Sequence, residues 1–513
     1  MADQMPDLLT VHAMTRGDKL ALVEEPGGRT RTFLELNSRV NRLANGLRKL
    51  GVQAGERISG MSYNSIEGSE AAHAARKAGA VATPINYHLK PAEAAYVIND
   101  SGARVVFASS DFLATIEEAR REVAGDVTYV AFGVDPPAGW LPYEELIHAS
   151  DDSEPEDQPG GMGATMIYTS GTTGYPKGAF RPKGVNVENV LQIIQIFELT
   201  DSDIHLVAGP GYHSAVSFFS FLNTVLGGTN VIERRFEAAE ALQLIGKHSI
   251  TTTFMAPTLV ARLLALPDEL KRSVDHSSLR AIFVGAAPFP QTLKEKGTAY
   301  FGEVLWEFYG ATETGINTVL RPEDQLRKPA SCGTAVPGQE IRLLDEEGVE
   351  VPTGMPGEFY VRNGWLAEYF NRPDATSSGF RDGFFSVGDI AYRDEDGYYY
   401  VCDRKIDMVI SGGVNIYPAE VEAVLHEHPA VEDAAVIGVP NEEFGEEVKA
   451  VVKLRPGTTA TELELIELCR QRLAGYKRPK SVDFVDDFPR DLAGKMQKRR
   501  LRDRYWQTVE RRV

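Results

Sequence analysis

The stretch YTSGTTGYPKG, residues 168–178, directly follows a short apolar run. Gly171, Gly174 and Gly178 permit positive φ and close approach of the backbone to a ligand, while the hydroxyls and Lys177 can hold phosphate oxygens. Because Lys177 follows Gly174 by three residues and precedes a glycine, the spacing is not the Walker pattern GxxxxGK[ST]. A flexible polar hairpin would need neither the lysine nor the ordered threonines. The stretch therefore predicts a polyphosphate-binding loop of a different kind.

The sequence around this loop has the pattern of an α/β protein. Thr32 and Glu35 form a capping box before a helix with apolar residues at spacings of three and four. Apolar runs at 104–108 and 127–132 flank a helical pattern around 112–123. This alternation is typical of helices packed on a mainly parallel sheet. We therefore expect a large multi-layer domain with mainly parallel sheets over residues 1–403.

A small mobile α+β domain is expected over residues 404–513, since a chain of 513 residues exceeds one ordinary core. Its expected elements are helices at 418–425 and 461–473 and strands at 431–439, 448–454 and 482–485.

The composition excludes several classes of protein. A net charge of −19 argues against nucleic-acid binding, and no run of 18 apolar residues suggests an integral membrane protein. The three cysteines, Cys332, Cys402 and Cys469, lie far apart and are expected to be free thiols. We expect a cytoplasmic enzyme, and the sequence leaves a homodimer open.

Four further strings accompany the loop in a characteristic order. They are YGATETG at 309–315, FSVGDIAYRDEDGYYY at 385–400, DRKIDMVISGGVNIYPAEVE at 403–422 and PRDLAGKMQKRRL at 489–501. Together with the loop, they resemble the motifs of the acyl-adenylate-forming (AMP-binding) superfamily, in its acyl-CoA synthetase branch, over nearly the whole chain. The resemblance implies activation of a carboxylic acid by ATP to acyl-AMP with pyrophosphate release, and then transfer to coenzyme A.

The resemblance also implies roles for individual residues. Glu313, with Thr169, would hold Mg²⁺, for which carboxylate oxygen is a suitable ligand. Asp389, expected at the end of a strand, would bind the ribose with Arg404 as its companion, and Tyr309 would stack on adenine. The full nucleotide set is Thr169, Ser170, Gly171, Thr172, Thr173, Gly174, Lys177, Gly285, Ala286, Ala287, Tyr309, Gly310, Ala311, Thr312, Asp389, Arg404 and Lys495.

The C-terminal residues are assigned to both half-reactions. Lys495 would hold the substrate carboxylate and the α-phosphate together, whereas its neighbours Lys498, Arg499 and Arg500 are expected to be surface charge. Gly412 and Gly413 would border the pantetheine tunnel after the small domain swings, and Lys477 would meet coenzyme A. At the hinge position this chain has Ile406, where the family usually has Asp or Lys, so the energetics of the swing are open.

The acid itself is only partly specified. His213 occupies the place where amino-acid-activating relatives carry Asp, which argues against an α-amino acid; it would gate the acyl tunnel or pack structurally. The expected lining is mostly apolar and favours a fatty, alicyclic or aryl acid: Val216, Phe218, Phe254, Met255, Val284, Ile316 and Asn317. Two alternatives remain, a stand-alone adenylation enzyme that loads a carrier protein and an inactive nucleotide-binding relative.

Overall fold

The structure is a computed structural model of the 513-residue chain. It describes residues 7–155, 164–169, 176–182, 184–185, 187–405, 407–411, 414–441, 444–490 and 496–506. Within these residues, no helix combines the length and the apolar character that a membrane span needs.

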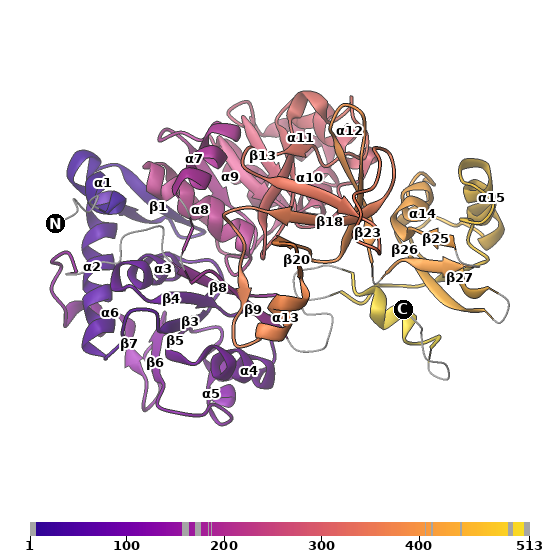
Figure 1. Ribbon diagram of the computed structural model, residues 1–513. Helices are drawn as coiled ribbons and strands as arrows, with labels where there is room; N and C mark the ends of the chain where they lie inside the picture. Colours follow the sequence, from indigo (N-terminus) through magenta and orange to yellow (C-terminus); the bar gives the residue numbers. More distant parts are fainter. Residues whose placement is uncertain are drawn as a thin grey trace.

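Two large sheets, each mainly parallel, form the body of the N-terminal part (Figure 1). The first runs in the order β16 (Thr334–Ala335), β15 (Gly315–Leu320), β14 (Leu305–Ala311), β13 (Ala281–Val284), β12 (Thr252–Met255), β10 (Ile204–Val207), β11 (Thr229–Glu233), β1 (Leu20–Glu25) and β2 (Arg29–Thr32). The second runs in the order β19 (Glu368–Tyr369), β9 (Lys177–Phe180), β8 (Ala164–Thr169), β4 (Val81–Pro84), β3 (Arg57–Met61), β5 (Ala103–Ser109), β6 (Thr128–Phe132) and β7 (Leu141–Pro142).

Helices cover these sheets, and a third, antiparallel sheet follows them in the chain. The helices are α1 (Leu8–Arg16), α2 (Phe33–Lys49), α3 (Ile66–Ala78), α4 (Pro91–Ser101), α5 (Leu113–Arg120), α6 (Tyr143–His148), α7 (Val187–Ile196), α8 (Ser214–Leu226), α9 (Ala238–Lys247), α10 (Pro257–Leu264), α11 (Asp268–Ser273), α12 (Gln291–Phe301) and α13 (Pro373–Ser378), with a 3₁₀ turn at Pro322–Asp324. The third sheet contains β17 (Glu340–Leu344), β18 (Gly357–Arg362), β20 (Phe380–Arg381), β21 (Phe384–Phe385), β22 (Asp389–Arg393) and β23 (Tyr399–Arg404).

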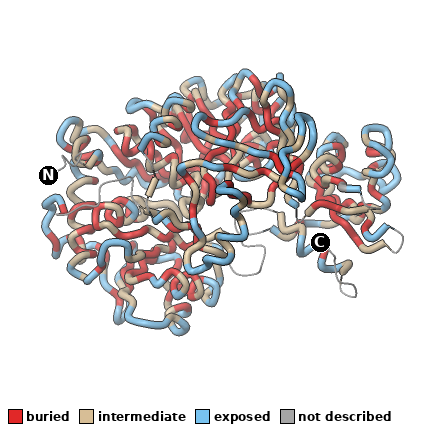
Figure 2. Tube along the Cα trace, in the orientation of Figure 1, coloured by how far each residue is buried: buried red, intermediate tan, exposed pale blue. Residues whose placement is uncertain are grey.

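Helix α2 forms where the sequence predicts a helix. Helix α2 begins with the Thr32/Glu35 capping box, in which each side chain accepts a hydrogen bond from the other residue's backbone N–H. Its apolar stripe is fully buried in the largest core cluster. Figure 2 shows the same division, with buried strands inside and exposed loops outside. Both the α/β class and this helix are therefore confirmed.

The C-terminal unit has its own sheet and core at one end of the molecule (Figure 1). The sheet contains β24 (Val409–Ser411), β25 (Val414–Ile416), β26 (Val431–Asn441), β27 (Gly445–Leu454) and β28 (Ser481–Phe484), and the helices are α14 (Pro418–Leu425), α15 (Glu462–Arg472) and α16 (Lys498–Arg502). The expected α+β architecture is confirmed. The domain boundary at 403/404 stays a prediction.

Candidate functional site

A large cavity of about 1400 Å³ brings many of the predicted residues together. Its wall contains side chains from the first two sheets, from α8 and from the third sheet, together with Arg490, Gln497 and Arg500 of the C-terminal part. The predicted site residues that line it are Thr169, Lys177, His213, Ala286, Ala287, Gly310, Ala311, Thr312, Glu313, Asp389 and Arg404.

Glu313 is a buried carboxylate, with 7% of the residue exposed, at one side of this cavity. Thr169 Oγ1 and Tyr369 Oη donate hydrogen bonds of 3.0 and 2.9 Å to the same oxygen, Oε1. No described residue donates to Oε2. Burial and the nearby Glu313 charge both raise the pKa of Tyr369, so its hydroxyl remains a donor. The carboxylate is thus held by neutral groups and keeps one oxygen for a cation.

The peptide before Glu313 is fixed by Arg181, which the sequence analysis missed. Arg181 Nη2 donates to the Thr312 carbonyl at 2.5 Å, and its Nε donates to the Trp365 carbonyl at 2.5 Å. Burial lowers the pKa of Arg181 to about 10, which still leaves it charged at neutral pH. Thr312 Oγ1 also lies 3.1 Å from Ser214 Oγ at the start of α8. A lone arginine after a strand gives no sequence signal for this role.

Asp389, Tyr309 and Arg404 form a second polar group at the cavity. Tyr309 Oη donates to Asp389 Oδ2 at 2.6 Å, and Arg404 Nε lies 3.3 Å from Asp389 Oδ1. Burial and the Asp389 charge both raise the pKa of Tyr309, which keeps this hydroxyl protonated. The expectation that Asp389 ends a strand is wrong. It begins β22, because the turn at Gly388, with φ of 83°, precedes it.

The turn from Gly285 to Ala287 follows β13 and approaches β14 closely. A Cβ at Gly285 would lie 2.8 Å from the Phe308 ring, so a larger residue would push this turn away. Ala286 has φ of 71°, an unusual conformation for a residue with a side chain. Ala286 and Ala287 line the cavity, whereas Gly285 and Tyr309 are not among its lining residues. Adenine stacking on Tyr309 remains a prediction.

His213 caps α8 and also faces the cavity. Its Nδ1 accepts a hydrogen bond of 3.3 Å from the Ala215 N–H, and its ring stacks on Phe254 with centroids 6.2 Å apart. These contacts agree with a packed structural role and leave the gating role as a prediction. Of the expected acyl lining, Phe218 and Ile316 line the cavity, whereas the others are buried outside its lining, in the surrounding core: Val216, Phe254, Met255, Val284 and Asn317.

Two C-terminal lysines, Lys477 and Lys498, form ion pairs. Lys477 forms an ion pair with Glu420. The expectation that Lys498 is surface charge is wrong. Its side chain is 14% exposed, and Nζ lies 2.8 Å from Glu422 and 3.5 Å from Asp403, because α16 packs against β26 and α14 carries Glu422 beside it. Burial alone would lower the pKa of Lys498, but the Glu422 and Asp403 charges raise it above its usual value.

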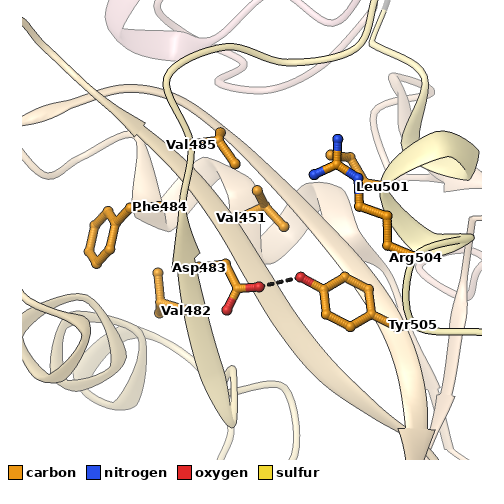
Figure 3. Close-up of a pocket in the computed structure, with 8 residues that line it drawn as sticks. All are labelled: Val451, Val482, Asp483, Phe484, Val485, Leu501, Arg504 and Tyr505. Carbon is orange, nitrogen blue, oxygen red and sulfur yellow. Dashed lines mark hydrogen bonds between the residues drawn. The ribbon is translucent and has the colours of Figure 1, made fainter.

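Several predicted residues lie outside the described part of the chain. They are Ser170, Gly171, Thr172, Thr173, Gly174, Ile406, Gly412, Gly413 and Lys495. Within the described part, no cluster of three His, Cys, Asp or Glu side chains has the arrangement of a metal site, and all three cysteines are free and buried. A smaller cavity of about 400 Å³ lies between β27, β28 and the α16 region, beside the hydrogen bond from Tyr505 to Asp483 (Figure 3). None of the predicted site residues is in its described lining.

Comparisons with known proteins agree with this geometry. Residues 9–370 match the AMP-binding enzyme family, and residues 420–495 match the AMP-binding enzyme C-terminal domain. The chain is 38% identical to a feruloyl-CoA synthase of an Amycolatopsis species over 93% of this chain and 95% of that protein. It is 35% identical to an indoleacetate–CoA ligase of Aromatoleum aromaticum over 91% and 92%. The crystal structure of ATP-bound MatB from Rhodopseudomonas palustris superposes with a TM-score of 0.87 at 31% identity over 98% and 99% of the two chains. The chain therefore belongs to the adenylate-forming AMP-binding enzyme family.

Proposed function

We propose that this protein is an AMP-forming acid–CoA ligase. The observation that carries the proposal is the cavity in which Thr312 and Glu313 meet Asp389 and Arg404, which are distant in the sequence. Arg181 and Thr169 hold the first two residues by hydrogen bonds, and Asp389 and Arg404 form an ion pair. The two sequence relatives are named as acid–CoA ligases, and the solved MatB structure is named as binding ATP. The residues that line the cavity and the names of these relatives thus support the same function.

In the first half-reaction, a carboxylate oxygen of the acid attacks the α-phosphorus of ATP, and the bond from that phosphorus to the bridging oxygen breaks to release pyrophosphate. Positioning and charge stabilisation supply most of the rate in such a reaction. Thr312, held by Arg181 and Ser214, places its hydroxyl at the cavity wall. Asp389 and Arg404 orient the ribose, and Lys177 supplies charge to the phosphates.

The residues present fit a magnesium ion beside the phosphates. Glu313 Oε2 receives no hydrogen bond from a described residue, while Thr169 and Tyr369 fix the other oxygen. Mg²⁺, when bound, supplies positive charge to the phosphate oxygens. Glu313 would hold it, with Thr169 beside it. The carboxylate oxygen that accepts no hydrogen bond from a described residue supports this assignment.

In the second half-reaction, the sulfur of coenzyme A attacks the acyl carbonyl carbon, and AMP leaves as the thioester forms. Gly412 and Gly413 would border the thiol path, Lys477 would meet coenzyme A, and Lys495 would serve the first half-reaction only. The division into domains at 1–403 and 404–513 belongs to the same proposal. The separate sheet and core of the C-terminal unit support it.

The acid is proposed to be aromatic. Phe218, Phe308 and Trp365 line the cavity near Thr312, and Phe218 and Trp365 pack edge to face with centroids 5.6 Å apart. Such a wall suits a flat ring. The two named relatives act, by their names, on feruloyl and indoleacetate groups, which are both aromatic.

The test is a panel of short, long-chain, aryl and polycyclic carboxylic acids with ATP and Mg²⁺, assayed for pyrophosphate release with and without coenzyme A. We expect release that rises with coenzyme A, with acyl-CoA detected by mass spectrometry and aryl acids turned over fastest. Adenylate that accumulates regardless of coenzyme A would favour a carrier-protein ligase. Nucleotide binding with no acid activated would favour the inactive relative.

A further inference from the structure

One face of α8 lines the cavity along two turns of the helix. Ser214, Ser217, Phe218 and Phe221 follow the spacing i, i+3, i+4, i+7, and all four belong to the cavity wall. Ser214 lies beside Thr312, where the acid's carboxylate must react. At 1.5 Å per residue, Phe221 lies about 10 Å further along the helix. The cavity therefore extends away from the reaction centre toward Phe221.

Arg76 of α3 stands at this far end. Its guanidinium carbon lies 6.0 Å from the centroid of the Phe221 ring, and Arg76 also lines the cavity. His73, one turn earlier on α3, stacks on the same ring with centroids 5.5 Å apart. Arg76 and His73 thus fix the position of Phe221, and the far end of the cavity combines an aromatic ring with a guanidinium.

Two of the donors on Arg76 have no acceptor. Nη1 is bonded to the Asp7 carboxylate, but Nε and Nη2 are buried and receive no acceptor from any described residue. The Arg76 side chain is only 11% exposed, and it lines the large cavity. Buried donors are nearly always satisfied in folded proteins, and a molecule bound in the cavity that Arg76 lines could supply the acceptor.

The Asp7 carboxylate, which pairs with Arg76, determines which kind of acceptor suits the free N–H groups of Arg76. Burial alone would raise the pKa of the Asp7 carboxyl, but the hydrogen bond and charge of Arg76 lower it to about 2. Asp7 is therefore ionised at neutral pH, and Lys77 Nζ lies 3.5 Å away on its other oxygen. Asp7 and Glu154, which lies 2.8 Å from Lys77 Nζ, together offset the charges of Arg76 and Lys77. A second carboxylate therefore gains little there, whereas a neutral oxygen gains two directed N–H groups.

We propose that Arg76 is a specificity residue that recognises a neutral hydrogen-bond acceptor on the end of the substrate remote from its carboxylate. The substrate class is then an aromatic acid with a hydroxyl, methoxy or carbonyl group at that end. The proposal rests on the proposed acid–CoA ligase function and names its substrate more closely.

The experiment compares 3-phenylpropenoic acid with its 4-hydroxy, 4-methoxy, 4-methyl and 4-carboxy derivatives on the full-length enzyme, with kcat/KM measured from pyrophosphate release. For the wild type we expect the 4-hydroxy and 4-methoxy acids to exceed the 4-methyl acid by about tenfold or more, since the methyl group fills the space but accepts no hydrogen bond. A 4-carboxy acid that is preferred over the 4-hydroxy acid would overturn the proposal.

The variants are R76M and the double variant D7N/R76M, which removes both charges so that no carboxylate is left buried alone. In each variant the tenfold preference for the 4-hydroxy and 4-methoxy acids over the 4-methyl acid should fall to about one. The matched control, R272M, replaces an exposed arginine on α11 and should keep the preference. Rescue by R76K should be partial, because Lys lacks the planar fork.

The outcomes separate the two proposals. If the double variant keeps the wild-type preference, the role of Arg76 is wrong and the ligase function stands. If the wild type activates other acids of the panel but none of these five, the substrate class is wrong. If the wild type activates no acid at all, the ligase function fails and the inference fails with it.

Discussion

The Glu313 carboxylate of the cavity and two lysines of the C-terminal unit have different kinds of partner. Glu313 is held by the hydroxyls of Thr169 and Tyr369, which are neutral. Lys477 and Lys498 are instead neutralised by carboxylates of their own unit, Glu420 and Glu422. A charge held by neutral donors is available to a ligand, whereas a charge in an ion pair must first exchange its partner. Glu313 can therefore bind a ligand directly, whereas Lys477 and Lys498 either leave their ion pairs before binding or serve only to stabilise the fold.

The largest effect is expected from Lys495, which the family resemblance assigns to the adenylation half-reaction. K495A should lower ATP–pyrophosphate exchange by about 10³, because one preorganised donor is lost where charge develops. Thioester formation from synthetic acyl-AMP should remain largely intact and serves as the internal control. Equal loss in both half-reactions would refute a role limited to adenylation.

The second prediction concerns the charge of the Glu313 carboxylate. E313Q keeps the size of the side chain and removes its charge, so we expect pyrophosphate release to fall by about 10² at saturating ATP and to respond less to added Mg²⁺. The control is E368Q, an exposed glutamate one residue before Tyr369. An unchanged Mg²⁺ dependence in E313Q would show that the carboxylate does not hold the metal.

The third prediction concerns the contribution of the Lys498 ion pairs to the stability of the C-terminal unit. K498M leaves Glu422 and Asp403 without their buried cation and should cost about 3 kcal/mol in the free energy of unfolding of the C-terminal unit. The measurement is chemical denaturation, with R499M on the exposed face of the same helix as control. If both variants unfold at the same denaturant concentration, the Lys498 pairs contribute nothing to stability.

Lys477 gives the smallest effect. K477A should raise the KM for coenzyme A by about tenfold and leave adenylation unchanged, because a phosphate contact of one lysine is lost. E420Q, which frees Lys477, should lower the same KM by a few fold. The exposed Lys480 supplies the control variant K480A. A KM that none of these changes moves would leave Lys477 as a structural residue of its own unit.

The motif residues were predictable because each lies in a short string whose neighbours identify it. Thr312 and Glu313 stand inside YGATETG, and the structure places both on the cavity. Arg181 and Tyr369 were not predictable. Their hydrogen bonds to Thr312 and Glu313 join residues 131 and 56 positions apart, and no local pattern encodes such a contact.

Errors arose where a local pattern was read without its tertiary partner. KRR at 498–500 has the composition of an exposed basic run, yet Lys498 forms an ion pair with Glu422 of α14, and its side chain is only 14% exposed. The position of Asp389 after a glycine and two residues after Val387 predicts the end of a strand, but the turn at Gly388 has a positive φ and β22 begins at Asp389. The composition of these short segments reveals neither the carboxylate partner of Lys498 nor the backbone turn at Gly388.

The sequence alone determined the elements whose causes are local. The capping box and apolar stripe of α2, the α+β succession of the C-terminal unit and the family motifs depend on residues within a few positions of one another. The tertiary structure decided how the charges are met. It paired Asp7 with Arg76 across 69 residues, left two of that arginine's donors facing no acceptor, and joined Tyr309 to Asp389 across 80. Burial and partner choice depend on which surfaces pack together, and only the folded chain fixes that.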